Sequence, residues 1–314
     1  MARPLIGLAL GSGAGRGWTH IGVIQGLKEA GVDPDLICGT SIGALVGGAY
    51  LSNHMASLES WACSLTKLRI LRYLDFRVGG GGFIGGDKLH ELLTKNLGDL
   101  KFSDLTKPFT AVATDLSTGH EIWFREGSVA QAIRASYALP GVFTPVKVDG
   151  QWLVDGALVN PVPVSVCRAM GAKLVIASDL GADVIGKHWK KAEERPATNV
   201  EARQVLAERK EAENVTKASQ GSIVKSLVGS IFGGGDNDDE SHGLFSVMIA
   251  SLNILQDRVG RSRLAGDPPD VSITPRVGHI GLLEFDRAEE CIEEGRAAVE
   301  RALPMLRDAL AVLS

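Results

Sequence analysis

The chain has 314 residues with a formal net charge of −4, and 45% of its residues are hydrophobic. That length suits a single large α/β domain, and the apolar content is enough for a sizeable core. The slightly acidic charge balance argues against a nucleic-acid-binding surface. No stretch reaches the ~20 apolar residues of a membrane span, so we expect a soluble protein, at most attached to a membrane surface.

The cysteines point to an intracellular protein. Cys38, Cys63, Cys167 and Cys291 lie far apart, and their spacing matches neither a disulfide framework nor a zinc site. Cys38 and Cys167 fall in apolar runs, which favours buried free thiols. The N-terminal residues lack the spacer and cleavage site of a secretory signal. Together these features predict a cytoplasmic location.

The N-terminal part alternates short apolar strands with helices. Strands are predicted at 5–10 and 36–38, and helices at 19–30 and 42–51. Gly31 is a plausible end for the first helix. A sharp turn at Thr40–Ser41 leads from the second strand into a helix of small residues. This alternation predicts a parallel sheet with covering helices.

The alternation continues downstream. Strands are predicted at 109–114, 121–124, 146–148, 152–154 and 173–179, and helices at 129–136 and 163–170. Asp149-Gly150 is a favoured two-residue turn, so the strands on either side of it should form a hairpin.

The composition changes after about residue 181. Residues 187–218 are rich in Lys, Glu, Arg and Ala, which predicts a solvated helix, and residues 221–235 form a short amphipathic stretch. We interpret 183–243 as a variable insertion or lid, because its apolar content is too low for a core of its own. An apolar periodic stretch, a strand and a long helix follow at 244–255, 271–274 and 286–311. We therefore expect one domain, 1–314, with 244–314 as a C-terminal helical segment packing on the core.

The first motif with chemical meaning is Gly39-Thr40-Ser41-Ile42-Gly43, a G-x-S-x-G pattern. Such a turn bends sharply from strand to helix and exposes the serine hydroxyl, and side chains at the glycines would clash with neighbouring backbone. The start of the following helix lends positive potential to an attacking alkoxide. The motif alone is also compatible with an ordinary tight turn, but the flanking strand and small-residue helix favour a nucleophile.

The second motif is the glycine-rich loop after the first strand. Alternate positions are glycine: Gly11, Gly13, Gly15 and Gly17. Such a loop points several backbone N–H groups into one space, where they can stabilise an oxyanion or cradle a phosphate. A dinucleotide site requires G-x-G-x-x-G, but the sixth position is Arg16 or Trp18, depending on the starting glycine. No Gly-Lys-Ser/Thr follows for a P-loop, so nucleotide binding is the weaker interpretation.

A serine nucleophile needs a base, and Asp155 is one candidate. It follows the apolar run 152–154 and precedes Gly156, so its carboxylate can emerge at the end of a strand. Taken alone, Asp-Gly is a common turn.

Histidines are the other candidates, since α/β-hydrolases use the order Ser, Asp or Glu, His. His188 and His242 lie in or beside the charged stretch, and His279 is the best placed of those after Asp155. His20 falls on a helix that packs against the sheet and is expected to be structural. On the residues alone, a triad through His279 stays open.

In combination these residues resemble the patatin-like phospholipases, particularly the bacterial members. The resemblance rests on residues 11–17, 39–43, 113–115, 134–141 and 155–157, in that order, and more weakly on 264–270. It extends over roughly residues 5–180. It implies an α/β fold related to the α/β-hydrolases, a three-layer sandwich around a central, mostly parallel sheet.

The resemblance also implies site roles. The family uses a Ser–Asp dyad without histidine, which corresponds to Ser41 and Asp155. Its oxyanion hole corresponds to the backbone N–H groups of Gly13 and Ala14, with Arg16 at the basic position. The common loop has three consecutive glycines where this chain has Ser12-Gly13-Ala14, but a backbone donor survives these side chains. No metal or cofactor is required.

The implied activity is hydrolysis of lipid or phospholipid esters by a phospholipase A, lysophospholipase or esterase acting through an acyl-enzyme. Asp155 would act as the base, with its pKa raised by an apolar setting. The expected partner is a lipid ester, with peripheral membrane contact and no nucleic acid. Residues 221–235 could act as a lid or lie on the membrane interface, but their single lysine and single aromatic residue favour a helix packed on the body or a disordered linker. The alternative is a regulatory or interaction protein with little activity, whose charged surfaces bind a protein partner or a second copy.

Overall fold

A computed structural model describes residues 4–73, 82–84, 98–182 and 244–313, together with positions 88, 90, 91 and 94. The predicted insertion or lid at 183–243, with its charged helix and its amphipathic stretch, lies outside the described residues, as do His188 and His242.

The centre of the described fold is a mixed eight-stranded sheet. Its strands are β1 (Ile6–Leu10), β2 (Leu36–Thr40), β4 (Phe109–Asp115), β5 (Glu121–Phe124), β7 (Val146–Val148), β8 (Gln151–Asp155), β9 (Leu174–Ser178) and β10 (Val271–Ile273). The order is β10-β9-β1-β2-β4-β8-β7, and β5 also pairs with β4. The strands from β10 to β4 are parallel, whereas β5 and β8 run antiparallel to β4, and β7 runs antiparallel to β8. A small parallel sheet joins β3 (Gly82–Ile84) to β6 (Gly141–Phe143).

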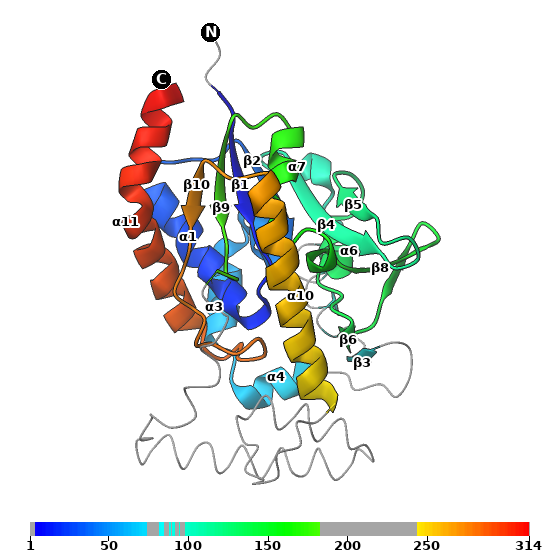
Figure 1. Cartoon of the computed structure of the whole chain (residues 1–314). Coiled ribbons are helices and arrows are strands. Elements are labelled where there is room, and N and C mark those ends of the chain that lie inside the picture. Colours follow the sequence, from blue (N-terminus) through cyan, green and yellow to red (C-terminus); the bar gives the residue numbers. More distant parts are fainter. Residues whose placement is uncertain are drawn as a thin grey trace, which may run out of the picture.

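Helices cover both faces of the sheet (Figure 1), which makes three layers. The helices are α1 (Thr19–Glu29), α2 (Ile42–Leu51), α3 (Met55–Cys63), α4 (Lys67–Tyr73), α6 (Val129–Ser136), α7 (Val164–Ala169), α10 (Leu244–Gly266) and α11 (Ala288–Leu313), with short 3₁₀ turns η1 (Ala14–Trp18), η2 (Phe102–Asp104) and η3 (Gly156–Leu158). One apolar cluster joins the sheet to α1, α2, α6 and α11. A second cluster joins the other face to α7 and to the end of α10. The α/β sandwich expected from the sequence is therefore confirmed.

The period-two alternation of strand side chains sorts them between these layers. Leu8 and Leu10 of β1 belong to the cluster under α1 and α2, whereas Ala9 belongs to the cluster with Val164 and Cys167 of α7. Both faces are apolar, because a parallel sheet is buried on both sides.

Most of the elements agree with the sequence predictions. Helices α2 and α6 have the predicted bounds, and the predicted hairpin is present, with positive φ angles of 48° at Asp149 and 87° at Gly150. Cys38 and Cys167 are buried, as expected. The sequence did not predict α3, α4 or the antiparallel pairing of β8 with β4, and α10 continues well past the apolar stretch at 244–255.

The C-terminal helix α11 packs closely along α1. A Cβ atom added to Gly22 would lie 1.9 Å from the Ile292 carbonyl oxygen, and one added to Gly295 would lie 2.2 Å from the Thr19 carbonyl oxygen. Two glycines therefore let the helix backbones touch.

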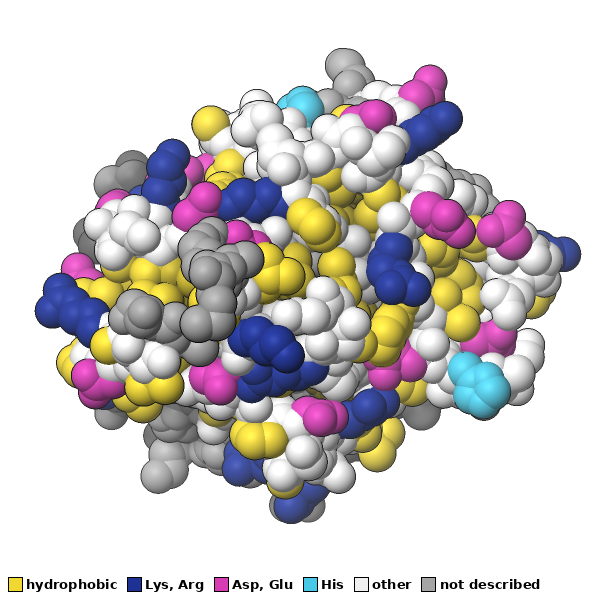
Figure 2. Space-filling view, turned by 90° about the horizontal axis from the view of Figure 1, so that it is seen from above, with side chains coloured by type: hydrophobic (Ala, Val, Ile, Leu, Met, Phe, Trp, Pro, Cys, Tyr) yellow, Lys and Arg dark blue, Asp and Glu magenta, His cyan; other side chains and the backbone are white. Residues whose placement is uncertain are grey.

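The face at the upper end of Figure 1 carries side chains of both charges, spread among hydrophobic ones (Figure 2).

Among the helices that the structure describes, none is long and apolar enough to cross a lipid bilayer.

Candidate active site

The sheet brings the serine turn and the aspartate together. Thr40, the last residue of β2, lies opposite Val112 of β4, and Asp155, the last residue of β8, lies opposite Ala113. Strand β5 occupies the other edge of β4 along the same residues, so β2 and β8 share one edge and meet end to end. Ser41 follows Thr40 directly and therefore lies beside Asp155.

Ser41 sits in a strained turn between β2 and α2. Its backbone has φ 58° and ψ −121°, a conformation that non-glycine residues rarely adopt. Its N–H donates to Ser136 Oγ at 2.8 Å, and that hydroxyl donates to the Val112 carbonyl oxygen at 2.6 Å. A Cβ on Gly43 would lie 2.2 Å from the Leu10 carbonyl oxygen. The second glycine of the motif is thus required because the turn presses against β1.

Ser41 and Asp155 form a direct hydrogen bond. Ser41 Oγ donates to Asp155 Oδ2 at 2.7 Å, and the Ala157 N–H donates to Oδ1 at 2.8 Å. Asp155 is 2% exposed, and its burial raises the pKa of the carboxyl to about 7, although the two hydrogen bonds oppose the shift. As expected from the sequence, the carboxylate can accept a proton near neutral pH.

The neighbours of Asp155 fix its position. Its N–H donates to the Ala138 carbonyl oxygen at 3.0 Å, and its own carbonyl oxygen accepts from Thr114 Oγ1 at 2.8 Å. A Cβ on Gly156 would lie 2.3 Å from the Val112 carbonyl oxygen. The Asp-Gly pair is therefore more than a turn, because only glycine allows β8 to end this close to β4.

The glycine loop lies next to the serine turn. A Cβ on Gly17 would lie 2.1 Å from Ile42 Cγ2, and one on Gly43 would lie 2.7 Å from the Gly11 carbonyl oxygen. Gly39 completes the turn from within β2, where an added Cβ would lie 2.5 Å from the backbone nitrogen of Ala44.

Most backbone N–H groups of the loop are occupied. Gly11 donates to Ser178 O, Ser12 to Pro161 O, Gly15 to Leu282 O and Arg16 to Gly13 O. Within the described part of the chain, the N–H groups of Gly13 and Ala14 donate to no other residue, which leaves them available to a ligand oxygen. Ala14 has a positive φ of 47°, where many loops would place glycine.

The Arg16 side chain is buried rather than exposed at the surface. It is 3% exposed, and its Nε donates to the Ile280 carbonyl oxygen at 2.7 Å. Burial lowers the pKa of the guanidinium to about 10, so the group stays positive at neutral pH. The arginine ties the loop to the segment that precedes α11.

The two histidines considered from the sequence and described here are engaged elsewhere. His20 is fully buried between Ser178 Oγ and the Gly11 carbonyl oxygen, and burial lowers its pKa to about 4. His279 Nε2 contacts Glu290 Oε1 at 2.6 Å. In the described part of the chain, no histidine hydrogen-bonds to Ser41 or Asp155. Among the residues that the structure describes, the Ser41 hydroxyl therefore pairs with Asp155 only.

A cavity of about 150 Å³ adjoins the loop beside the end of β9. Its wall includes Ser12 and Gly13 from the loop, Asp179 after β9, and Asp257 and Arg261 from α10. Within the described ranges, no group of three or more His, Cys, Asp or Glu side chains is placed to hold a metal ion.

The fold and the site are those of a three-layer α/β protein with a serine–carboxylate pair at the carboxyl edge of its sheet. The family model described as patatin-like phospholipase matches residues 8–168. An uncharacterized NTE family protein of Mycobacterium tuberculosis is 34% identical, over 96% of this chain and 91% of the relative. The chain belongs to the patatin-like phospholipase family, which supports a lipid ester hydrolase in general terms.

Other similarities are more limited. The human patatin-like phospholipase domain-containing protein 6 is 36% identical over 58% of this chain, but the match covers only 14% of that longer protein. Among solved structures, VipD from Legionella pneumophila is similar with a TM-score of 0.48 and 13% identity, over 96% of this chain and 67% of that chain. The second likeness is too weak to bear on function.

Sequence reasoning missed several residues that hold the site. Ser136 and Ala138 lie in the stretch 134–141, which carried the family resemblance but had no assigned role, and Thr114 lies in the stretch 113–115. The family resemblance of these two stretches was the signal that could have identified these three residues. The carbonyl oxygens of Ile280 and Leu282, which hold the glycine loop, lie in a segment without any motif.

Proposed function

We propose that the chain is a serine acyl hydrolase that cleaves carboxylic esters of lipids or phospholipids, with Ser41 as nucleophile and Asp155 as base. The observation that carries the proposal is the 2.7 Å hydrogen bond from Ser41 Oγ to a buried carboxylate whose pKa is raised to about 7. Membership of the patatin-like phospholipase family supports the substrate class.

In the first half of the reaction, Ser41 Oγ attacks the ester carbonyl carbon while its proton passes to Asp155 Oδ2. The carbonyl oxygen becomes an oxyanion that accepts hydrogen bonds from the N–H groups of Gly13 and Ala14. The positive end of α2 lies at Ser41 and favours this negative charge. The tetrahedral intermediate then collapses, Asp155 returns the proton to the leaving alcohol, and an acyl-enzyme remains.

The second half repeats these roles with water. Asp155 accepts a proton from a water molecule as the water oxygen attacks the acyl carbon, and the same two N–H groups stabilise the second oxyanion. Collapse releases the fatty acid and returns the proton to Ser41. Neither half uses a histidine, a metal or a cofactor in this scheme.

We also propose that the protein is cytoplasmic. It contacts the membrane surface peripherally, because its substrate resides in lipid aggregates. The alternative is a regulatory or interaction protein that keeps the fold with little activity. Nothing in such a role requires a strained Ser41 aimed at a buried carboxylate, so these two residues favour an enzyme.

The test is release of fatty acid from phosphatidylcholine and lysophosphatidylcholine dispersions, measured by mass spectrometry. We expect the wild-type protein to release fatty acid, and Ser41→Ala to release none above background. A wild-type protein that is inactive on both lipids and on simple esters would favour the interaction-protein alternative.

A further inference from the structure

The glycine loop is anchored by the segment that precedes α11. The Gly15 N–H donates to the Leu282 carbonyl oxygen at 2.8 Å, and Arg16 Nε donates to the Ile280 carbonyl oxygen at 2.7 Å. A Cβ on Gly15 would lie 3.0 Å from the Leu282 oxygen. Gly15 and Arg16, which provide these two donors, directly follow Gly13 and Ala14 in the chain. The positions of Gly15 and Arg16 therefore depend on where this segment places its carbonyl groups.

This anchoring segment, residues 276–287, lies between β10 and α11 and contains no helix or strand. Regular secondary structure therefore does not fix the positions of its carbonyl groups. The local backbone bonds are few, such as those from Ile280 N to Val277 O and from Glu284 N to Gly281 O. Side-chain contacts must supply the rest of its rigidity.

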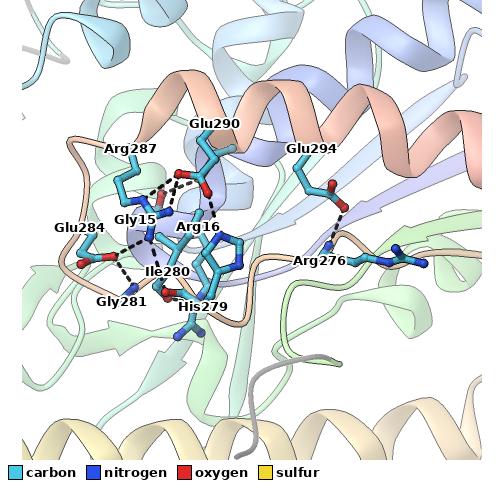
Figure 3. A network of polar contacts seen from close by, with 11 residues as sticks. Gly15, Arg16, Arg276, His279, Ile280, Gly281, Glu284, Arg287, Glu290 and Glu294 are labelled. Atoms are coloured by element: carbon cyan, nitrogen blue, oxygen red, sulfur yellow. Dashed lines mark hydrogen bonds and ion pairs between the residues drawn. The ribbon is translucent and has the colours of Figure 1, made fainter. Parts of the chain in front are cut away.

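Arg287 makes more of these contacts than any other described side chain of the segment (Figure 3). Its Nη1 donates to Glu284 Oε2 at 3.2 Å and reaches the His279 carbonyl oxygen at 3.5 Å. Its Nε donates to Glu290 Oε2 at 2.8 Å, and its Nη2 donates to the same oxygen. The Arg287 guanidinium therefore links His279 and Glu284 in the segment to Glu290 in the first turn of α11.

The carboxylates of Glu284 and Glu290 connect Arg287 to the parts of the segment that hold the glycine loop. Glu284 Oε2 also accepts from the Gly281 N–H at 2.9 Å, between the two anchoring carbonyl groups. Glu290 Oε1 contacts His279 Nε2 at 2.6 Å, next to Ile280. The Arg287 side chain is 16% exposed, whereas the side chains of Glu284 and Glu290 are 32% and 37% exposed, so water reaches the carboxylates more than the guanidinium.

We propose that Arg287 is a positioning residue for the oxyanion hole. By holding Glu284 and Glu290, it fixes the Ile280 and Leu282 carbonyl groups that set the glycine loop. It thereby sets the direction of the Gly13 and Ala14 N–H groups. The consequence for catalysis rests on the proposed function. The family match ends at residue 168, so this support comes from outside the matched region.

The guanidinium shape matters as well as its charge. Arg287 directs three nitrogens to acceptors on Glu284, Glu290 and the His279 backbone. A lysine ammonium is a single point donor and cannot span these acceptors in the same geometry. Arg287→Lys should therefore restore only part of the function that Arg287→Met loses.

The test compares Arg287→Met with Arg296→Met. Arg296 also lies in the first half of α11, but it pairs with Gln25 and Glu59, and among the described residues it forms no hydrogen bond or ion pair with the anchoring segment. For each variant we would measure kcat and KM on a 4-nitrophenyl ester, the pH dependence of kcat, and amide hydrogen exchange of Gly15. Glu290→Gln, which weakens the same grip with a smaller change, serves as a second variant.

We expect Arg287→Met to lower kcat by about 10- to 100-fold with little change in KM, because small misplacements of catalytic groups have effects of this size. The pH at half-maximal kcat should not move, because Asp155 is untouched. Gly15 should exchange at least ~10-fold faster, whereas β1 amides should not. Arg287→Lys and Glu290→Gln should fall between Arg287→Met and wild type.

Equal Gly15 exchange and equal kcat in Arg287→Met and Arg296→Met would overturn the inference. A shifted pH profile in Arg287→Met would do so too, because it would place the effect on the dyad. If the wild-type protein hydrolyses no ester, the proposed function fails, and Gly15 exchange alone then decides whether Arg287 holds the loop.

Discussion

At the scale of single residues, the site depends on keeping Ser41 in an unfavourable backbone conformation. A non-glycine residue in a sparsely populated region of φ/ψ space costs of order 1–3 kcal/mol, so surrounding contacts must hold it there. Ser136 supplies one such contact, because its hydroxyl accepts from Ser41 and donates to Val112 on β4. The strained turn is thereby linked to β4, the strand that pairs with β8 and so with the element that carries Asp155.

Ser136→Ala should weaken both stability and catalysis. The substitution leaves the Ser41 N–H and the Val112 carbonyl group buried without this partner, which costs about 1–3 kcal/mol per unsatisfied group. We expect kcat on a 4-nitrophenyl ester to fall at least ~10-fold, because the turn is less well held. Denaturant unfolding and ester kinetics check the two effects.

Ser52→Ala is the matched control. Ser52 ends the same helix α2, and its hydroxyl donates to the Gly48 carbonyl oxygen at 2.7 Å, away from the turn. We expect a stability loss below about 1 kcal/mol and unchanged kcat. Equal kcat in the two variants would show that Ser136 does not hold the nucleophile.

The buried Asp155 should make the protein less stable as the pH rises. Its pKa is about 7 in the folded protein and near the ordinary 3.8 in the unfolded chain. Between about pH 4 and 7 the unfolded state ionises while the folded state keeps its proton, so the free energy of unfolding falls through this window. The shift of about 3 units corresponds to roughly 4 kcal/mol, which is lost completely above pH 7.

Asp155→Asn should remove this part of the pH dependence. Burial also raises the pKa values of Asp179 and Asp286, but those groups contribute equally to both proteins. Urea unfolding at pH 5 and pH 8 would measure the effect. We expect the variant to lose less stability between these two pH values than the wild-type protein does. Parallel pH profiles would contradict the raised pKa of Asp155.

At the scale of secondary structure, α2 is built of small residues because two strands and the glycine loop press against its start. Gly43→Ala would push a Cβ atom to 2.2 Å from the Leu10 carbonyl oxygen, a backbone atom of β1 that cannot move alone. We expect a loss of about 1–3 kcal/mol in the free energy of unfolding and a large loss of ester hydrolysis.

Gly47→Ala tests the same helix one turn further along. There the nearest atoms to an added Cβ belong to the side chains of Ile37, Phe109 and Leu10, at 3.1–3.4 Å. Those side chains can adjust, and alanine favours a helix by up to ~1 kcal/mol over glycine, so we expect a much smaller change. Similar losses of stability and activity for Gly43→Ala and Gly47→Ala would show that packing at the start of α2 is no more sensitive than packing one turn further along.

Local patterns were enough to predict most elements. The small-residue helix at 42–51 and the Asp149-Gly150 hairpin carry their own signals, namely a G-x-S-x-G turn before one and a two-residue turn within the other. Strand order carries no such signal. The antiparallel return of β8 onto β4, which brings Asp155 to Ser41, depends on long-range pairing that no local pattern encodes.

At the scale of the whole molecule, distant parts of the chain complete one site. The proposed nucleophile and the glycine loop come from the first 43 residues and the proposed base from residue 155, while carbonyl groups near residue 281 hold the loop. The motifs pointed to Ser41 and Asp155, whose proposed roles use their side chains. Ile280 and Leu282 act through their backbones, so their identities left no pattern in the sequence.

The proposed mechanism requires a Ser–Asp pair that works without histidine. The most direct measurement is kcat/KM on a 4-nitrophenyl ester for wild type, Ser41→Ala, Asp155→Asn and His279→Gln, each checked for folding. Glutamine keeps a donor that can reach Glu290, the present partner of His279.

We predict that Ser41→Ala and Asp155→Asn fall at least ~10⁴-fold, the size of loss seen when a nucleophile or its partner is removed. His279→Gln should stay within about 10-fold of wild type, and wild-type kcat should rise with pH to a plateau above about pH 7, where Asp155 is ionised. A folded His279→Gln protein as inactive as Ser41→Ala, or an active Asp155→Asn protein, would contradict the proposed Ser–Asp mechanism.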